Sequence, residues 1–77
     1  MDRKQRKALI RERLHQMIVE SGYTQGEIAD MIDTSQSQVN SWATGKSFPG
    51  IVKLAELCEV LATNPTWALG ESSRRFL

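Results

Sequence analysis

The spacing of apolar residues between helix-ending positions is the feature that most constrains the fold of this chain. In the segments that end at Gly22, Gly45 and Gly70, apolar residues recur at intervals of three and four, which is the period of an amphipathic helix. No segment alternates apolar and polar residues with the period of two that a half-buried strand requires. The pattern predicts an all-α protein, and 77 residues suit one compact domain with a modest core.

The first two expected helices are separated by a short break. The first covers about residues 4–21, ends at Gly22, and carries one apolar stripe made of Ile10, Leu14, Met17 and Ile18. The second covers about residues 25–32. Thr24 precedes it and Glu27 follows three positions later, which predicts a capping box in which each side chain bonds the other's backbone N–H.

A third helix follows a tight turn at residues 33–34. Ser35 is its expected N-cap, and Gln38 occupies the capping-box position three residues on. The helix runs to about Thr44 and Gly45 ends it.

Two further helices complete the expected five-helix fold. The fourth covers about residues 51–61, with an apolar face made of Ile51, Leu54, Ala55, Cys58 and Leu61. The fifth is short, with Asn64 as its N-cap, Pro65 at its first position and Gly70 after its end. We therefore expect one domain over residues 1–70, and residues 71–77 as a tail or the start of a linker.

Composition excludes several classes of protein. The single cysteine, Cys58, allows no internal disulfide, which fits a reducing compartment. No apolar run approaches the ~18 residues of a membrane span. The basic N-terminus lacks the apolar stretch and cleavage site of a signal peptide, so we expect a cytoplasmic protein.

The charge distribution is more informative than the net charge of +1. Basic residues crowd the N-terminus, and residues 34–55 contain no acid while including Lys46 and Lys53. A charge run usually marks a solvated surface, but an acid-free and weakly basic zone also suits nucleic-acid binding.

The third helix divides into two faces when residues are placed about 100° apart. One face is apolar and contains Val39, Trp42 and Ala43. The other face carries only uncharged amide and hydroxyl side chains, those of Gln36, Ser37, Asn40, Ser41 and Thr44. Such side chains can bond the donors and acceptors of base edges in the major groove of DNA, although they can also simply keep a small helix soluble.

Three stretches within residues 23–49 carry a resemblance to a known family, and the resemblance as a whole covers about residues 9–70. YTQGEIADMI, SQSQVNSW and WATGKSFP resemble the lambda-repressor/Cro-like helix-turn-helix family of prokaryotic and phage transcriptional regulators. The resemblance implies five helices, sequence-specific binding of double-stranded DNA and commonly a dimer. This sequence has Asp33 where the family usually has glycine in the turn, and Asp tolerates the left-handed conformation better than most residues.

The resemblance also assigns roles to the residues around the turn. Gln25 would point toward Gln36, and Gln36 and Ser37 match the positions that most often read bases. Gln38 could read bases or close the capping box, and we favour the capping box.

The phosphate contacts are expected from residues that flank the third helix. The candidates are the free amides near Thr24 and Gln25, and Lys46 and Ser47 in the following loop. An N-terminal arm made of Arg3, Lys4, Arg6 and Lys7 could also reach phosphates or stay a frayed, solvated end. We expect Tyr23 to pack in the core rather than on DNA.

The remaining residues suggest an interface but no catalysis. A dimer could use the apolar residues of the C-terminal part, Val60, Trp67, Leu69, Phe76 and Leu77, although Trp67 and Leu69 could instead cap the core. His15 has no metal-ligand partner and is expected at the surface, and Cys58 is expected to be a buried thiol. We predict no enzyme activity, no metal and no cofactor.

The predicted function is a transcriptional regulator, most simply a repressor that binds a palindromic operator as a dimer. The chain could equally be the DNA-binding part of a longer repressor. The alternative is an antitoxin-type protein-interaction module that also binds DNA. Contact with RNA polymerase through Glu27 and Asp30 is conceivable, but ordinary helix surface explains this acidic pair better.

Overall fold

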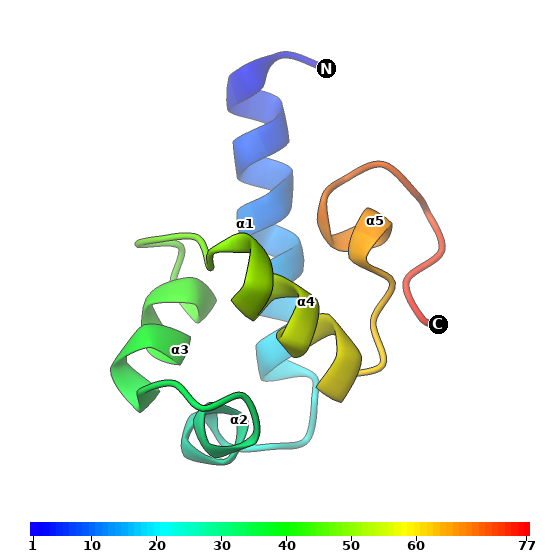
Figure 1. Ribbon diagram of the computed structural model, residues 1–77. Coiled ribbons are helices and arrows are strands. Elements are labelled where there is room, and N and C mark those ends of the chain that lie inside the picture. The colour runs from blue at the N-terminus through cyan, green and yellow to red at the C-terminus, as the bar shows by residue number, and fades with distance from the viewer.

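The computed structural model describes residues 1–77 as five helices without a strand (Figure 1). The helices are α1 (Arg3–Val19), α2 (Gln25–Met31), α3 (Gln36–Ala43), α4 (Ile51–Val60) and α5 (Pro65–Ala68). The only β-type pairing is an isolated bridge between Thr63 and Phe76. The predicted all-α, five-helix fold is confirmed. None of the helices combines the length and apolar character that crossing a membrane would require.

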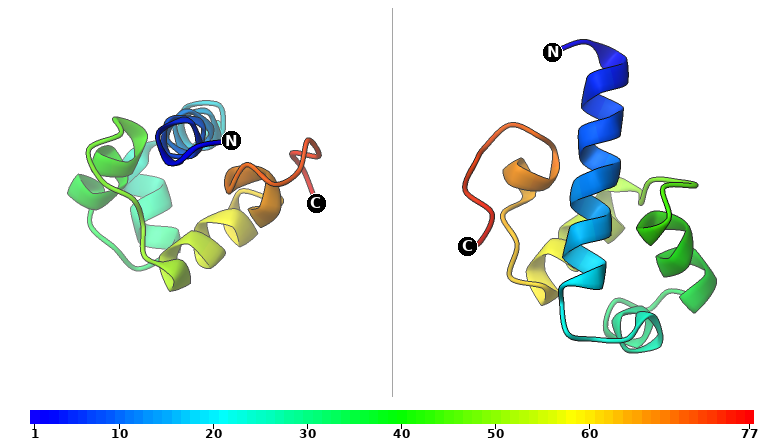
Figure 2. Two further views of the ribbon diagram at one scale, coloured as in Figure 1. Left: turned by 90° about the horizontal axis from the view of Figure 1, so that it is seen from above. Right: turned by 180° about the vertical axis from the view of Figure 1, so that it is seen from behind.

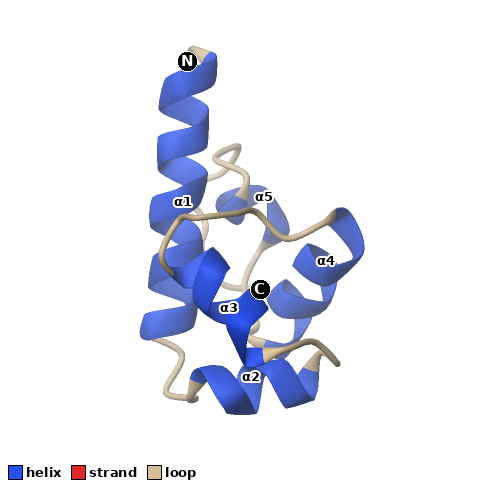
Figure 3. Ribbon diagram, turned by 90° about the vertical axis from the view of Figure 1, so that its left-hand side faces the viewer, coloured by secondary structure: helices blue, strands red, loops and turns tan.

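The four short helices are arranged around α1, which runs through most of the length of the molecule (Figures 1 and 2). Figure 2 shows α2 and α3 on one side of α1, α5 and the tail on the other, and α4 between the two groups. Figure 3 shows α3 seen from its own side of the molecule, with α2 beneath it. This arrangement leaves one side of α3 facing away from all other helices.

One apolar core receives side chains from all five helices. Its members are Leu14, Met17, Ile18, Ile28, Ala29, Ile32, Val39, Trp42, Ala43, Leu57, Cys58, Trp67 and Ala68. The stripe predicted on α1 is confirmed, with Ile10 packed at the edge of the core rather than inside it. The buried face of α3 is the one predicted from its period.

Side-chain caps fix the beginnings of four helices. Asp2 and Gln5 form a capping box at α1, so the N-terminal basic residues belong to an ordered helix rather than a frayed arm. The capping box of Thr24 and Glu27 is confirmed. At α3, Ser35 accepts the Gln38 N–H at 3.1 Å, but the Gln38 side chain does not bond back, so the predicted box is only half formed.

Left-handed residues fix the ends of four helices. Gly45 and Gly70 have φ angles of 78° and 82°, and Asp33 and Ala62 have φ angles of 53° and 50°. In each case the next residue's N–H bonds a carbonyl five positions back, as for Lys46 to Ser41 at 2.9 Å. The left-handed conformation expected at Asp33 is confirmed. Ala62 was not anticipated, because alanine gains nothing from a conformation that costs a Cβ clash.

Two predictions about burial are wrong. Ile51 is 84 % exposed and Ala55 is also exposed, because the face of α4 that meets the core is formed by Leu54, Leu57, Cys58 and Leu61. Tyr23 is 47 % exposed and lies outside the core. It follows Gly22, whose left-handed φ of 83° turns the chain away from α1 before α2 begins.

The tail folds back onto the body of the domain. The backbone N–H of Asn64 bonds the Arg75 carbonyl at 2.7 Å, and that of Leu77 bonds the Ala62 carbonyl at 3.2 Å. Arg75 also pairs with Glu20 at the end of α1 at 2.6 Å. Residues 71–77 therefore pack against the ends of α1 and α4 instead of extending into solvent.

Candidate DNA-binding surface

The α2–α3 pair is a rigid unit with a tight turn. Ala29 of α2 is almost fully buried, and its small side chain lets α3 approach closely. Ile28 and Val39 are completely buried beside it. The Thr34 N–H bonds the Ala29 carbonyl at 2.9 Å, which closes the turn after α2. The two helices are thereby held at a fixed angle before any ligand is present.

The outward face of α3 presents uncharged polar side chains to solvent. Gln36, Ser37, Asn40 and Thr44 are exposed, while Ser41 is half-buried at the edge of the face. We call these five residues the reading face. Trp42, on the opposite side of the helix, is buried in the core and prevents α3 from rotating about its axis. The structure thus brings together all five residues that the period predicted.

Two of the polar groups on the reading face are already hydrogen-bonded within the chain. Asn40 Nδ2 donates to Gln25 Oε1 at 3.2 Å, so the amide partner of Gln25 is Asn40 rather than Gln36. The Thr44 hydroxyl donates to the Asn40 carbonyl at 2.8 Å. The side chain of Asn40 keeps its second amide hydrogen and its Oδ1 oxygen for another partner, and Thr44 keeps its methyl group.

The C-terminal end of α3 is fixed by two side chains from α1. Arg11 Nε donates to the Gly45 carbonyl at 3.2 Å. His15 Nδ1–H donates to the Ala43 carbonyl at 2.9 Å, since a carbonyl can only accept. His15 is exposed as predicted, but its positioning role was missed. Arg11 and His15 are four residues apart, so the sequence places them on one side of a helix. Only the fold shows that this side contacts the end of α3.

Lys53 of α4 fixes the turn in a similar way. Its ammonium group donates to the carbonyls of Ile32 and Asp33, the latter at 3.2 Å, and it lies 3.4 Å from a Glu56 carboxylate oxygen. The charge of Lys53 is therefore committed to the end of α2. Among the basic residues of the acid-free zone, Lys46 is the one that remains exposed beside α3.

The predicted phosphate contacts flank the reading face at both ends. Lys46 and Ser47 are exposed immediately after α3. At the start of α2, the Glu27 carboxylate accepts the Thr24 N–H at 2.8 Å, so this amide is not free, contrary to the prediction. The N–H groups of Gln25 and Gly26 have no partner in the chain. A negative side chain therefore lies beside these free amides, which makes this end less attractive to an anion than Lys46.

The apolar candidates for an interface differ in their availability. Trp67 is only 7 % exposed and is covered by the guanidinium groups of Arg13 and Arg75, at 4.6 and 5.1 Å from the ring. Val60 is half-buried against the core. Leu69 and Phe76 are 39 % and 57 % exposed, so they, with Leu77, are the candidates that remain accessible.

The groups that could carry chemistry are not assembled into a reactive site. Cys58 is fully buried on α4, and this burial raises the pKa of its thiol, which disfavours the nucleophilic thiolate. No three His, Cys, Asp or Glu side chains lie together as metal ligands.

This combination defines a helix-turn-helix DNA-binding domain. The model of the helix-turn-helix family HTH_3 matches residues 14–67, from the second half of α1 into α5. The chain therefore belongs to this family of Cro/C1-type DNA-binding transcriptional regulators, as its sequence motifs predicted.

The fold is also similar to a solved repressor structure. The SOS-response transcriptional repressor LexA from Eubacterium rectale, determined in solution, is 29 % identical to this chain, with a TM-score of 0.77. The match covers 95 % of this chain and 78 % of that one. A search of curated protein sequences found no match.

Proposed function

We propose that this protein is a transcriptional repressor that binds a palindromic operator as a homodimer, with α3 inserted in the major groove. The observation that carries this proposal is the reading face: exposed amide and hydroxyl groups on a helix whose other side is locked into the core. Without a long charged side chain, such a face can approach base edges closely. The groove, about 12 Å wide, admits one helix of this kind.

Each side chain of the reading face has hydrogen-bonding groups or a methyl group that match a partner among the bases. Gln36 lies at the start of α3 with an unengaged amide, which can bond an adenine edge through both its donor and its acceptor. Asn40 can do the same with the N–H and carbonyl that Gln25 leaves free. Ser37 and Ser41 can bond several bases, and the methyl group of Thr44 suits the thymine methyl.

The phosphate backbone is assigned to groups outside the reading face. Lys46 and Ser47 follow α3 directly, so they would lie beside the backbone when the helix enters the groove. These contacts would set affinity and register rather than sequence preference. Gln25 would support base reading through its bond to Asn40.

The dimer follows from the small number of bases that one helix can read. Two copies related by a two-fold axis would read half-sites about 34 Å apart, which is one turn of DNA. The exposed Phe76 and Leu77 offer apolar surface for such a contact. The similar LexA structure is that of a repressor, which supports repression over activation. Such a protein would act in the cytoplasm of a prokaryotic host.

The alternative roles receive no comparable support. Residues 71–77 pack on the domain, so this segment is not free to reach a partner as it would be in an antitoxin-type module. A polymerase contact through Glu27 would compete with its capping bond to Thr24.

Selection of bound sequences from random duplex DNA tests the proposal directly. We expect an enriched palindrome, and Gln36→Ala should lose about 1–3 kcal/mol on that site and relax the preference at one base position. Glu59→Ala is the control, because Glu59 is exposed on α4 rather than on α3 or its flanking segments. Equal binding of all sequences by the parent chain would refute direct base reading.

A second pair of variants tests the division between bases and phosphates. Lys46→Ala should weaken binding to every sequence similarly and reduce the slope of log affinity against log salt by about one. Lys4→Ala, on an exposed part of α1, should leave that slope nearly unchanged. A sequence-dependent loss in Lys46→Ala would show that this lysine reads a base instead.

A further inference from the structure

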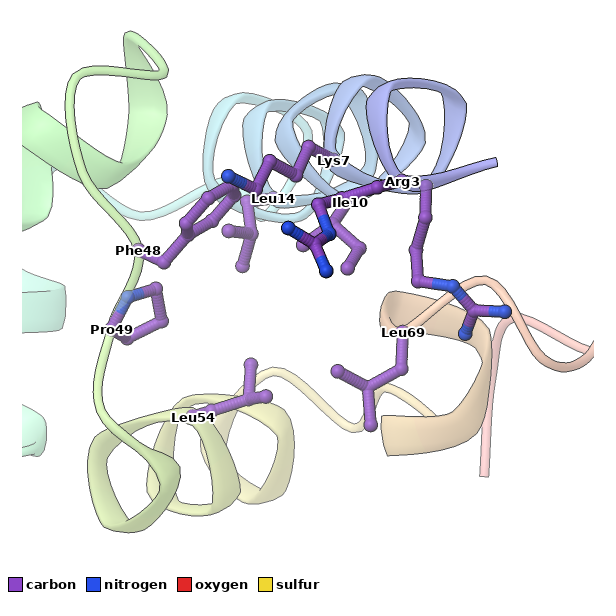
Figure 4. Close-up of a pocket in the computed structure, with 9 residues that line it drawn as sticks. Arg3, Lys7, Ile10, Leu14, Phe48, Pro49, Leu54 and Leu69 are labelled. Atoms are coloured by element: carbon purple, nitrogen blue, oxygen red, sulfur yellow. The ribbon is translucent and has the colours of Figure 1, made fainter. Parts of the chain in front are cut away.

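A cavity of about 300 Å³ lies between α1, the loop after α3, α4 and α5 (Figure 4). It shares no residue with the reading face of α3. Its lining consists of Arg3, Arg6, Lys7, Ile10, Leu14, Phe48, Pro49, Leu54 and Leu69. This volume falls at the lower end of the range of sites that hold small molecules, about 300–1,000 Å³.

The body of the cavity is apolar. Leu14 is a fully buried core residue, and Leu54 and Leu69 project from the side opposite α1 (Figure 4). Phe48 and Pro49 close one end. No lining residue has a carboxylate, amide or hydroxyl side chain. A ligand in this space would therefore bury an apolar body, with a gain of about 25 cal/mol for each Å² covered.

The rim of the cavity is cationic. Arg3, Arg6 and Lys7 are three and four positions apart on α1, so they share the face that continues into Ile10 and Leu14. Figure 4 shows Lys7 extending toward Phe48 and Arg3 toward Leu69. Arg6 is paired with Glu71, whereas no carboxylate lies within ion-pair distance of Arg3 or Lys7. Two positive charges at the rim thus remain uncompensated.

The chain's own C-terminal apolar residues do not fill the cavity. Phe76 is bridged to Thr63, and the Leu77 N–H bonds the Ala62 carbonyl, near the end of α4. Viewed from above, the tail lies on the outer side of α5, away from the space between α1 and α4 (Figure 2). The cavity is therefore open to a separate molecule.

We propose that this cavity is a binding site for a small amphipathic anion, a molecule with an unbranched apolar chain and a carboxylate head. The chain would lie against Ile10, Leu54 and Leu69. The carboxylate would meet either Lys7, at the Phe48 end of the rim, or Arg3, at the Leu69 end. An amphipathic cation would be repelled by the positive charges of Arg3 and Lys7. A small polar anion would not cover the apolar surface of the leucines. This site is independent of DNA reading, because a chain that binds no operator could still bind such an anion.

Titration with decanoate below its micelle concentration tests this site, with decanol as the neutral probe of equal chain length and decyltrimethylammonium as the cation. By calorimetry and NMR shifts, we expect saturable one-to-one binding of decanoate, with shifts at Leu54, Leu69 and Phe48. Decanol should bind about tenfold more weakly, a difference of about 1.4 kcal/mol. The cation should bind more weakly still.

Variants separate the rim from the apolar body. Arg3→Gln combined with Lys7→Gln should reduce decanoate affinity to that of decanol, while leaving decanol binding unchanged. Leu69→Trp should fill the cavity and abolish binding of both probes. Lys4→Gln is the matched control, because Lys4 is a neighbouring basic residue that does not line the cavity. Circular dichroism and thermal unfolding verify that each variant is folded.

Several results would overturn the proposal. Equal affinities for decanoate and decanol would refute the anion preference, and shifts located away from the cavity would refute the site. If the NMR signals of the cavity residues change with protein concentration in the absence of ligand, a second copy of the chain covers the cavity instead. DNA binding by the parent and by Leu69→Trp, measured in parallel, distinguishes failure of this site from failure of the proposed operator binding.

Discussion

Helices α3 and α4 are of similar length, contribute to the same core, and differ in what they present outward. The outward face of α3 is polar and uncharged, and both ends of the helix are held, by the Ser35 cap and by Arg11 and His15 from α1. The outward face of α4 carries the exposed apolar residues Ile51 and Val52. Its N-cap, Gly50, makes no side-chain bond.

The difference shows that the two helices have separate roles, one in presenting polar side chains outward and the other in supporting its neighbours. The core and the neighbouring helix α1 fix the position of α3, so its outer side chains are free for an external partner. Helix α4 instead supports its neighbours, through Lys53 at the turn after α2 and through Leu57 in the core. Its own outer surface has no equivalent arrangement of hydrogen-bonding groups.

The largest expected effect concerns the inner side of α3. Trp42→Ala should lower the free energy of unfolding by about 3–5 kcal/mol, because it removes a large buried side chain and leaves a cavity. Ile51→Ala, at the exposed start of α4, should change it by less than about 0.5 kcal/mol. Urea denaturation followed by circular dichroism measures both.

If Trp42→Ala fails to fold, Val39→Ala offers a smaller truncation at an equally buried position of α3. A large loss in Ile51→Ala would contradict the comparison, since it would mean that the outer side of α4 is buried in solution, for example against another copy.

The second effect concerns the support that α4 gives to the turn. Lys53→Met keeps the aliphatic stem and removes the donors to the Ile32 and Asp33 carbonyls, so we expect a loss of about 1–2 kcal/mol. Glu56→Gln, which removes only the exposed ion pair with Lys53, should cost less than about 0.5 kcal/mol. Equal losses in the two variants would mean that the ion pair, not the bonds to the turn, is what matters.

The smallest expected effect is a gain in stability rather than a loss. Ala62→Gly should raise the free energy of unfolding by about 0.5–1 kcal/mol, because glycine adopts the positive φ at the end of α4 without a Cβ clash. The same substitution inside the helix, Ala55→Gly, should lower it by about 1 kcal/mol. Thermal unfolding of the two variants gives the comparison, and destabilisation by Ala62→Gly would refute the assigned backbone conformation.

The sequence predicted the bounds of both helices, but it predicted the buried face of α3 better than that of α4, for one physical reason. In α3, apolar and polar residues are fully separated, so only one rotation buries Trp42. In α4, apolar residues occur on several sides, so the period alone does not decide whether Ile51 or Leu57 meets the core. The choice depends on how the chain enters the helix from Pro49 and Gly50, which is a property of the folded loop.

For the candidate site, the sequence predicted which side chains face outward but not which of them meet. All five members of the reading face follow from the period of one helix. The bonds from Gln25 to Asn40, from His15 to Ala43 and from Lys53 to Asp33 join different helices. Such contacts depend on distances between helices, which no local pattern contains.

The sparse bonding of the reading face has a consequence for how this protein can change. Gln36, Ser37 and Ser41 have no side-chain hydrogen bond within the chain and lie on the side of α3 away from the core. Substitutions there would scarcely alter the stability of the fold. Under the proposed function, new DNA-sequence preferences could therefore arise at these positions one residue at a time, through intermediates that all remain folded.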